Sequence, residues 1–319
     1  MIRLVQNEWM KISYRIGTWI MVALLLVGMI GTLIFAIKTK PSDESLSTKE
    51  WKTELQIQNE VNKKELKETE FTYQKRNLEK QIAANEYRLK HDLPPKDALG
   101  SDAWTYVKSN VGLLQLVGVF VIIIAATIVS SEYKNGTIKL LLIRPPSRFK
   151  ILMSKYITVQ LYSLLLVAVL FIMSFILGAI FFGFNSQFVD LAYHNGEISE
   201  RSQVASMLYY YLASSAQFVV LGTLSFAIST VFRSEAISIA ISVLAYIVGG
   251  TVTSLLLFFF DWGKYLLFAN DPAQYFMDEV PLAEGMSLGF SLIVISVYWL
   301  IFLGIAVFIF QKREVKTGS

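Results

Sequence analysis

The stretch VGLLQLVGVFVIIIAATIVSSEYKNGTIKLLLIRPPSRFK, residues 111–150, decides the fold class of this chain. Up to Ser131 it contains no Asp, Glu, Lys or Arg, and a short basic segment follows. A helix needs roughly 20 apolar residues to cross about 30 Å of hydrocarbon. One charge at the centre of such a helix would cost roughly 2.5–3.5 kcal/mol on insertion. The stretch therefore predicts a transmembrane helix and a polar turn at the membrane surface.

Runs without Asp, Glu, Lys or Arg recur along the whole chain, at residues 16–37, 109–131, 156–189, 202–232, 236–260 and 285–311. The chain is 54% hydrophobic and 17% charged, which excludes disorder and disfavours a soluble domain. The first run is too long for a signal peptide and lacks a small-residue cleavage site, so we expect it to be retained. The sequence predicts an all-α polytopic membrane protein with six transmembrane helices.

Three regions follow from this division. Residues 1–37 should hold an interfacial helix and the first span, residues 38–110 an extracytoplasmic helical insertion, and residues 111–319 a bundle of the other five spans. Within that bundle, residues 132–155 should form a cytoplasmic loop.

Basic residues on the short connections set the expected orientation. One side would carry only Arg201 and Lys264, whereas the other would carry Arg3, Lys11, Arg15, Lys134, Lys139, Arg144, Arg148, Lys150, Lys155, Arg233, Lys312, Arg313 and Lys316. The insertion is nearly balanced in charge and too long to contribute. Both termini and the 132–155 loop are therefore expected in the cytoplasm.

The first fifteen residues have the period of an amphipathic helix. One face would collect the apolar residues Ile2, Val5, Trp9, Ile12 and Ile16, and other faces would carry Arg3, Glu8, Lys11 and Arg15. Such a helix would lie along the inner membrane interface with Trp9 among the headgroups. The alternative is an ordinary basic flank of the first span.

Residues 49–90 of the insertion contain no Gly or Pro and are rich in Glu, Lys and Gln, which are good helix formers. A short apolar seam is indicated by Leu78, Ile82, Asn85 and Leu89, with a second fragment at Trp51 and Leu55, and Leu93-Pro94-Pro95 should end the helix. We expect a solvated helix or helical hairpin. A spacer, a partner-docking domain and a ligand-binding domain all remain open for it.

Two further features lie in or between the later spans. Residues 261–284 alternate acidic and apolar patches, which favours a shallow re-entrant or surface helix pair. Gln217 is expected to form a hydrogen bond between helices, because an unpaired amide in lipid is costly. A face of small residues in the fifth span favours close helix packing, or else lines a pathway: Ser238, Ser242, Ala245, Gly249 and Thr253.

Motifs for chemistry within the chain are absent from the sequence. It has no Gly-x-x-x-x-Gly-Lys-Ser/Thr phosphate loop, no His-Glu-x-x-His and no Cys, and His91 and His194 lie outside the six runs. We therefore expect no catalytic residues, no bound metal or cofactor and no nucleic-acid partner. The chain should not be an enzyme by itself.

The basic loop has the pattern of a short helix between two breaks. Glu132 ends the second run, Asn135-Gly136 permits a turn, Thr137 can cap a helix, and Pro145-Pro146 ends it. The helix would have an apolar side and a basic rim, made of Ile138, Leu141, Leu142, Arg144, Arg148 and Lys150. It could transmit a push to two spans at once, or it could bind lipid headgroups.

The segment Glu-x-x-x-Gly-Thr-Ile-x-Leu-Leu-Leu-x-Arg-Pro-x-Ser-Arg at 132–148 resembles the loop after the second span in ABC-2 type transporter permeases. The resemblance extends to the amphipathic N-terminal helix, the six spans, the cytoplasmic ends and the re-entrant segment, and the long insertion departs from it. It implies that the loop docks on an ATP-binding cassette ATPase through Glu132, Gly136, Thr137, Arg144 and Arg148.

The resemblance also implies the surroundings of the chain. These are two separate ATPase subunits that bind ATP and Mg, a second permease subunit, identical or homologous, and the lipid of a bacterial plasma membrane. The substrate would be an antimicrobial peptide or a lipid-like molecule. Similar permeases also export polymers or extrude ions, and the sequence leaves the substrate and the direction of transport open. Two rivals remain: a membrane receptor or sensor that binds ligand at the insertion and recruits a signalling protein inside, and an assembly factor without a transport cycle.

Overall fold

The computed structural model describes residues 1–39, 48–95, 102–137, 146–184, 189–194, 196–276 and 281–312. In these ranges it contains six helices that are long and apolar enough to cross a membrane: α2 (Ile16–Lys38), α6 to α7 (Ala103–Lys134), α9 (Arg148–Phe181), α10 (Gln203–Phe232), α11 (Glu235–Phe259) and α12 (Leu288–Lys312). The predicted fold class is confirmed. The chain is an all-α, multi-pass membrane protein.

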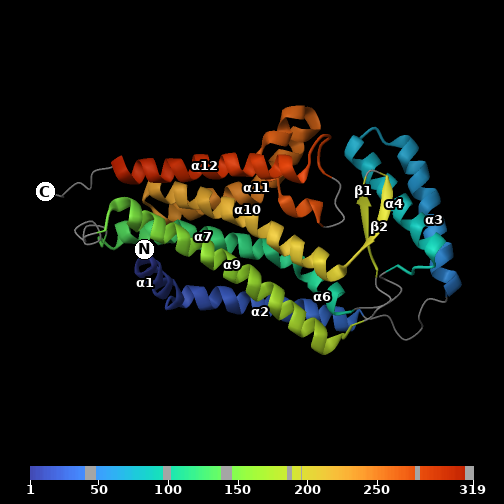
Figure 1. Ribbon diagram of the computed structural model, residues 1–319, viewed down its shortest axis with the longest axis horizontal. Helices are drawn as coiled ribbons and strands as arrows, with labels where there is room; N and C mark the ends of the chain where they lie inside the picture. Colours follow the sequence, from blue (N-terminus) through green and yellow to red (C-terminus); the bar gives the residue numbers. More distant parts are fainter. Residues whose placement is uncertain are drawn as a thin grey trace.

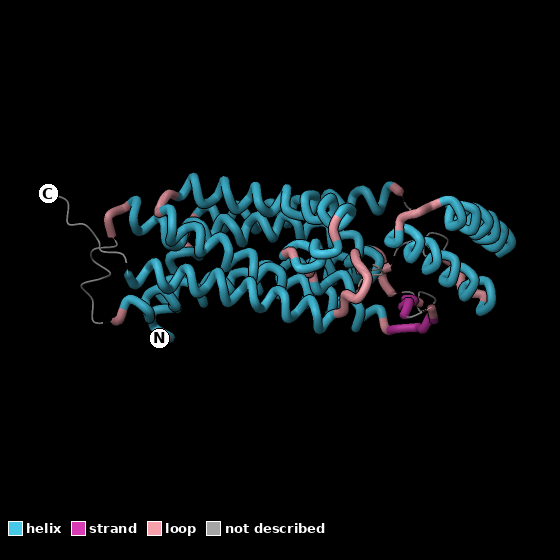
Figure 2. The backbone as a smooth tube through the Cα atoms, turned by 90° about the horizontal axis from the view of Figure 1, so that it is seen from above, coloured by secondary structure: helices cyan, strands magenta, loops and turns pink. Residues whose placement is uncertain are grey.

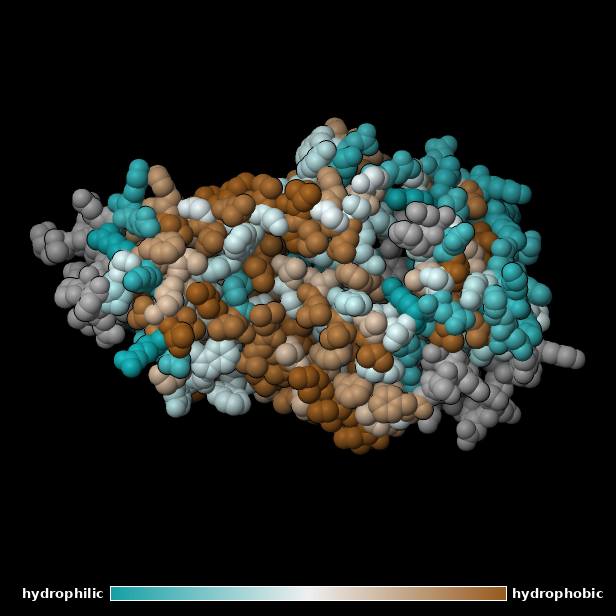
Figure 3. All heavy atoms as spheres, viewed as in Figure 1, coloured by the Kyte–Doolittle hydropathy of each residue, from teal (hydrophilic) through white to brown (hydrophobic). Residues whose placement is uncertain are grey.

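The spanning helices run along the long axis of the molecule (Figure 1). Helices α7 and α10 are the most buried, and α10 packs against α7, α9, α11 and α12. Their contact is polar as well as apolar, because Ser225 and Ser229 of α10 donate hydrogen bonds to the carbonyls of Ile122 and Ala126. The outer helices expose apolar side chains over the middle of the molecule (Figure 3), as a lipid-facing surface requires.

The two ends of the bundle differ in structure (Figures 1 and 2). One end carries α1 (Ile2–Ser13), the end of α7 (Leu114–Lys134), the start of α9 and the end of α12, and we call it the terminal end. We call residues 135–147, between α7 and α9, the connection. The opposite end carries a helical hairpin and a two-stranded sheet, and we call it the insertion end. Hydrophilic residues cover the hairpin at the insertion end (Figure 3).

The insertion is a helical hairpin of α3 (Thr48–Glu68) and α4 (Thr72–His91), as predicted. The predicted seam is buried at Leu78 and Ile82, and Trp51 and Leu55 of α3 are buried too. Asn85 contributes a hydrogen bond to Asn59 Oδ1 at 2.9 Å. Helix α4 ends before Pro94-Pro95, with Asp92 in the left-handed conformation, which closes the last turn.

The hairpin is attached to the bundle rather than free. The Phe71 ring packs on Phe258 of α11, with ring centroids 5.2 Å apart, and Arg76 Nη2 donates to the Pro281 carbonyl at 2.8 Å. Helix α4 also contacts the sheet of β1 (Asp190–His194) and β2 (Glu197–Arg201). The sheet is an antiparallel pair in the segment between the third and fourth apolar runs.

The boundaries of two spans were predicted wrongly. Helix α9 begins at Arg148 rather than at residue 156, and Ser147 caps it by accepting a bond from Lys150 N. Helix α6 begins at Ala103 rather than at residue 109, because Asp102 accepts a 2.7 Å bond from Thr105 N. In both cases the helix begins several residues before the uncharged apolar run. The run therefore identifies the part of the helix that faces hydrocarbon, but not where the helix starts.

The helix pair predicted within residues 261–284 is also wrong in the described part of that range. Three short 3₁₀ helices stand there: η2 (Asp261–Tyr265), η3 (Leu267–Ala269) and η4 (Pro272–Tyr275). Asn270 lies between η3 and η4, and its side-chain amide donates hydrogen bonds to the carbonyls of Lys264 and Leu266. Asp271 then caps η4 by accepting a 2.9 Å hydrogen bond from Ala273 N.

Candidate functional site

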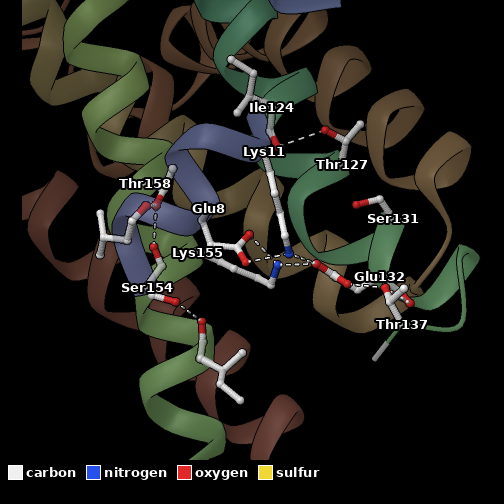
Figure 4. A network of polar contacts seen from close by, with 12 residues as sticks. Glu8, Lys11, Ile124, Thr127, Ser131, Glu132, Thr137, Ser154, Lys155 and Thr158 are labelled. Atoms are coloured by element: carbon white, nitrogen blue, oxygen red, sulfur yellow. Dashed lines mark hydrogen bonds and ion pairs between the residues drawn. The ribbon is translucent and has the colours of Figure 1, made fainter. Parts of the chain in front are cut away.

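A network of four charged side chains, three of them buried and Lys11 at its exposed edge, lies at the terminal end, next to the predicted coupling loop (Figure 4). Glu8 and Lys11 come from α1, Glu132 from the end of α7 and Lys155 from the second turn of α9. Residues far apart in the sequence therefore meet at one place. The network joins the amphipathic helix to both flanks of the 135–147 connection.

Each lysine of the network bridges the same two carboxylates. Lys155 Nζ lies 2.7 Å from Glu8 Oε2 and 2.9 Å from Glu132 Oε1. Lys11 Nζ lies 3.0 Å from Glu8 Oε1 and 2.9 Å from Glu132 Oε1. Two positive and two negative charges cancel, so the network is neutral as a whole.

Burial makes this pairing obligatory. Lys155 is 1% exposed, Glu8 5% and Glu132 7%. A single buried charge is strongly unfavourable unless a partner compensates for it, and losing one partner of a buried pair is costly for that reason. Burial lowers the pKa of Lys11, but its bonds and charge interactions with Glu132 and Glu8 outweigh this and raise the pKa above its ordinary value. The lysine at the edge is therefore held in its charged form.

The start of the connection folds back onto the network. The Thr137 hydroxyl donates a short hydrogen bond to Glu132 Oε2, and its oxygen also lies 3.4 Å from the Glu132 carbonyl. Gly136 has a φ of +69°, the left-handed region that favours glycine. This turn brings Thr137 back to the carboxylate at the end of the same helix.

Further contacts fix α1 on the bundle. The Trp9 ring packs in a tilted arrangement on Tyr162 of α9, with ring centroids 4.2 Å apart. Arg15, between α1 and α2, donates to Thr127 Oγ1 at 3.4 Å and to Ser131 Oγ at 3.3 Å on α7. The predicted amphipathic helix is therefore present, but it packs on α7 and α9. Its predicted polar face was misassigned at Glu8, which is buried, and its apolar face at Ile2 and Ile16, which are exposed.

The connection is also tied to the remaining helices. Lys134 at the end of α7 forms a 3.0 Å salt bridge with Glu235 at the start of α11. Arg148 at the start of α9 donates to the Gln311 carbonyl of α12 at 3.4 Å. Both flanks of the connection are therefore bonded to helices other than their own.

The structure brings together only some of the predicted coupling residues. Glu132 and Thr137 meet in the network, Gly136 is exposed beside them, and Arg148 is exposed on the first turn of α9. Glu132 is buried rather than displayed for contact with another protein. Arg144 and the predicted coupling helix, with Ile138, Leu141 and Leu142, lie outside the described residues.

Sequence reasoning missed Glu8, Lys11 and Lys155. It placed Glu8 and Lys11 on a polar helix face and treated Lys155 as the end of a loop. The available signal was a pair of opposite charges one turn apart on an apolar N-terminal helix, together with a single lysine directly before the third apolar run. Neither signal says which residues meet.

The other predicted positions lie in the packed bundle. Gln217 of α10 is buried, but its Oε1 has no hydrogen-bond partner within the described part of the chain, so the predicted interhelical bond is not made through that atom. On α11, Ser242 and Thr253 are buried, Ala245 is partly buried, and Gly249 lies against the Phe268 ring. The small residues therefore pack within the bundle, and their use as a pathway stays a prediction.

Metal ligands do not gather in the described ranges, where no group of three or more His, Cys, Asp or Glu could hold an ion. The only ionic cluster described above is the lysine–glutamate network, whose charges are mutually satisfied. Its arrangement suits the mechanical joining of helices rather than the chemistry of a reaction.

Fold and site together define a multi-pass, all-α membrane protein whose terminal end is joined by a buried charge network. The chain belongs to the family described as "Protein of unknown function (DUF2705)", whose model matches residues 87–316. It is 41% identical over 318 residues to the "Uncharacterized protein YhcI" of Bacillus subtilis (strain 168), covering 99% of each chain.

A second relative from the same organism is the "Uncharacterized membrane protein YdbK". It is 32% identical over 213 residues, which cover 66% of this chain and 82% of that protein. Its printed name agrees with the multi-pass architecture. Neither relative's name states an activity, so the activity must be argued from the structure.

Proposed function

We propose that this chain is the permease subunit of an ABC-2 type exporter, driven by separate ATPase subunits. The sequence of the 132–148 segment suggests the class, and the structure supplies a physical reason why that segment could receive mechanical work. The argument depends on how the flanks of the connection are held.

The observation that carries the proposal is the anchoring of the connection at both ends. On one side, Glu132 links α7 to α1 and α9 through Lys11 and Lys155. On the other side, Arg148 links the start of α9 to α12. A force on the residues between these flanks would therefore act on several spanning helices together. A connection without such links would absorb the force by bending.

In this proposal the residues of the loop have different tasks. Gly136, Arg144 and Arg148 belong to the part that a partner would touch. Glu132 and Thr137 instead hold the start of the loop against the network, so Glu132 acts by positioning and not by direct contact. Closure of the ATPase subunits on ATP would push the loop, and the neutral network would carry α1 along with α7 and α9.

The remaining parts of the proposal concern partners and location. ATP and Mg would bind to the partner ATPase subunits, and this chain would hold no cofactor and perform no catalysis by itself. A second permease subunit, identical or homologous, would complete the pathway. The terminal end, with both chain ends, would face the cytoplasm of a bacterial cell across the plasma membrane, and an antimicrobial peptide or a lipid-like molecule would be exported.

The test is purification of the tagged chain from its native membrane under mild conditions. We expect an ATPase subunit with a phosphate loop to co-purify, and its nucleotide hydrolysis to change when the permease is present. Recovery of the intact chain from the native membrane without any ATPase, in repeated preparations with nucleotide present, would contradict the proposal.

One observation favours a second function, that of a receptor. A cavity of about 440 Å³ lies at the insertion end, between the hairpin and the sheet. A receptor would bind ligand there and recruit a signalling protein at the terminal end. Co-purification of such a protein in place of an ATPase would favour this function.

A further inference from the structure

We propose that the cavity at the insertion end binds a phosphate-bearing polar group. The cavity lies between α4, α6 (Ala103–Ser109) and the β1–β2 sheet, and α3 contributes to its rim. This inference concerns the opposite end of the molecule from the charge network. It does not depend on the proposed coupling to an ATPase.

Positive charge dominates the lining. Lys80 and Arg88 of α4 and Lys108 of α6 contribute to the wall, and the single lining carboxylate is Asp190. Asp190 is 2% exposed and lies 2.7 Å from Arg201 Nε, which neutralises it. Each of the three lining cations also has contacts within the protein. The preference for an anion therefore comes from the number of positive side chains in the wall relative to negative ones, and it does not require a cation without a partner.

The remaining lining adds hydrogen-bonding groups and a small apolar part. Asn77 and Gln81 of α4 supply amide donors and acceptors, and Leu191 and Ile198 of the sheet supply apolar surface. Lysine and arginine are the side chains that proteins use most for phosphate oxygens. Amides beside them suit the hydroxyl groups of a phosphate ester. The volume falls within the range of roughly 300–1,000 Å³ that is typical of small-molecule sites.

The position of the cavity suggests where the phosphate comes from. Lys108 stands in the first turns of the spanning helix Ala103–Lys134, and Asp190 and Leu191 follow shortly after the end of α9. Because the cavity lies beside the ends of two spans, we expect it to be near the level of the lipid headgroups. A phospholipid headgroup and a soluble phosphate ester share the chemistry that the wall recognises, and an experiment can separate them.

The experiment uses the full chain and two probes. In the first arm the purified protein is reconstituted with phosphatidylcholine alone or with added phosphatidylglycerol, and lipid retained after delipidation is identified by native mass spectrometry. In the second arm glycerol 1-phosphate is titrated by calorimetry into the detergent-purified protein. We expect binding in one arm at least, and weakening as salt is raised, because the attraction is electrostatic.

Matched variants locate the binding. Lys80→Met and Lys108→Met should each weaken it about tenfold, since each removes a charge-assisted contact. Lys90→Met removes the same charge from an exposed position on α4 outside the cavity and should leave binding unchanged. Lys80→Arg should retain binding, which distinguishes loss of charge from loss of fold.

Each outcome decides the inference. Retention of phosphatidylglycerol that depends on Lys80 identifies a lipid headgroup, and calorimetric binding that depends on Lys80 identifies a soluble ester. Absence of binding in both arms, or an equal loss in Lys90→Met, would overturn the inference. The proposed exporter function would be unaffected, because neither arm involves an ATPase.

Discussion

Lys155 of α9 stands between the carboxylates of Glu8 and Glu132, 1% exposed and in contact with both. The two carboxylates that this lysine contacts compensate for the hydration it loses on burial. The reverse also holds, because the two glutamates depend on this cation. At the residue scale, the charge balance of the buried network therefore depends on this one side chain.

Replacing this cation should be strongly destabilising. Lys155→Met leaves two buried carboxylates with only Lys11 between them, and we expect a loss of about 3–5 kcal/mol in the free energy of unfolding. Thermal unfolding in detergent, followed by circular dichroism, measures the effect. Lys134→Met removes an exposed salt bridge at the same end and should cost no more than about 1 kcal/mol. Equal losses in the two variants would show that burial of the network is unimportant.

Gly249 shows how closely α11 approaches its neighbour. A Cβ atom added at this position would lie 2.2 Å from Cε2 of Phe268, whose ring packs against the core. Gly250 has nothing within 4 Å of such an atom. The two adjacent glycines thus differ in packing and share one helix.

The pair gives a matched test of packing. Gly249→Ala should destabilise the protein by about 1–3 kcal/mol because the Phe268 ring must move. Gly250→Ala should stabilise it by up to about 1 kcal/mol, because alanine has the higher helix propensity. Melting temperatures of the two variants check the prediction. A Gly249→Ala protein as stable as Gly250→Ala would mean that the ring yields without cost.

At the scale of elements, the 135–147 connection begins with a turn that only glycine adopts easily. Gly136 has a φ of +69°, and nothing lies within 4 Å of a Cβ added there. A substitution therefore acts through the backbone and not through a clash. The turn directs the chain from α7 into the segment that a partner would touch.

Gly136→Val should disturb this turn and uncouple transport from ATP hydrolysis, while membrane insertion is retained. The local cost is roughly 1–2 kcal/mol, the strain of a left-handed branched residue. Gly196→Val is the control, because Gly196 has a φ of +92° in a turn directly before β2, at the insertion end. Resistance to an exported antibiotic, or transport by vesicles, measures coupling. Full ATP-dependent activity in Gly136→Val would contradict the coupling assignment.

The α3–α4 hairpin is held to the bundle by few side chains. Arg76 reaches the Pro281 carbonyl before α12, and Tyr87 lies 3.3 Å from Glu200 on β2. An element with few anchors separates from its neighbour more easily than one with a large shared core. The hairpin is therefore expected to be the first part of the described chain to detach.

Removal of one anchor should expose the hairpin without unfolding the spans. Arg76→Met loses the bond to Pro281 and is expected to speed hydrogen exchange in α4 and in the segment that follows Pro281, with little change in the melting temperature. Lys75→Met changes the neighbouring, exposed charge and should leave exchange as it is. Exchange measured by mass spectrometry distinguishes the two variants. Unchanged exchange in Arg76→Met would show that the other contacts suffice.

At the scale of the whole molecule, the two ends must face opposite sides of the membrane. The spanning helices separate the terminal end from the insertion end (Figure 2). Because the chain contains no cysteine, one introduced thiol can report on each end without a background signal. Ser199→Cys on β2 and Lys150→Cys on α9 place thiols at exposed positions of the two ends.

A membrane-impermeant maleimide applied to intact cells should label Ser199→Cys and not Lys150→Cys. Both should be labelled after the membrane is opened. The reason is the excess of Lys and Arg at the terminal end, which favours the cytoplasmic side. Labelling of Lys150→Cys in intact cells would reverse the proposed orientation and remove the basis for an internal ATPase.

The sequence by itself determined the six spans, because about 20 uncharged apolar residues in succession have no stable place except a bilayer-spanning helix. It also predicted the helical character of the insertion, since helix formers and the proline stop act locally, but it left open whether one helix or a hairpin forms. Helix ends were less accurate, as at Arg148 and Ala103, because capping residues extend a helix past its apolar run. The 3₁₀ turns between α11 and α12 depend on individual polar residues, whose effect is not visible in a pattern of hydropathy.

Only the tertiary structure decided the charge network. From the local sequence, each of its residues has an ordinary interpretation. Glu8 and Lys11 fit a polar helix face, and Glu132 and Lys155 fit the ends of spans. Their meeting depends on how α1 packs against α7 and α9, and charges can be buried there only because opposite charges arrive from distant segments. Hydropathy patterns and helix propensities reflect only a few neighbouring residues. The ion pair between Glu8 and Lys155, by contrast, joins residues that are 147 positions apart in the sequence.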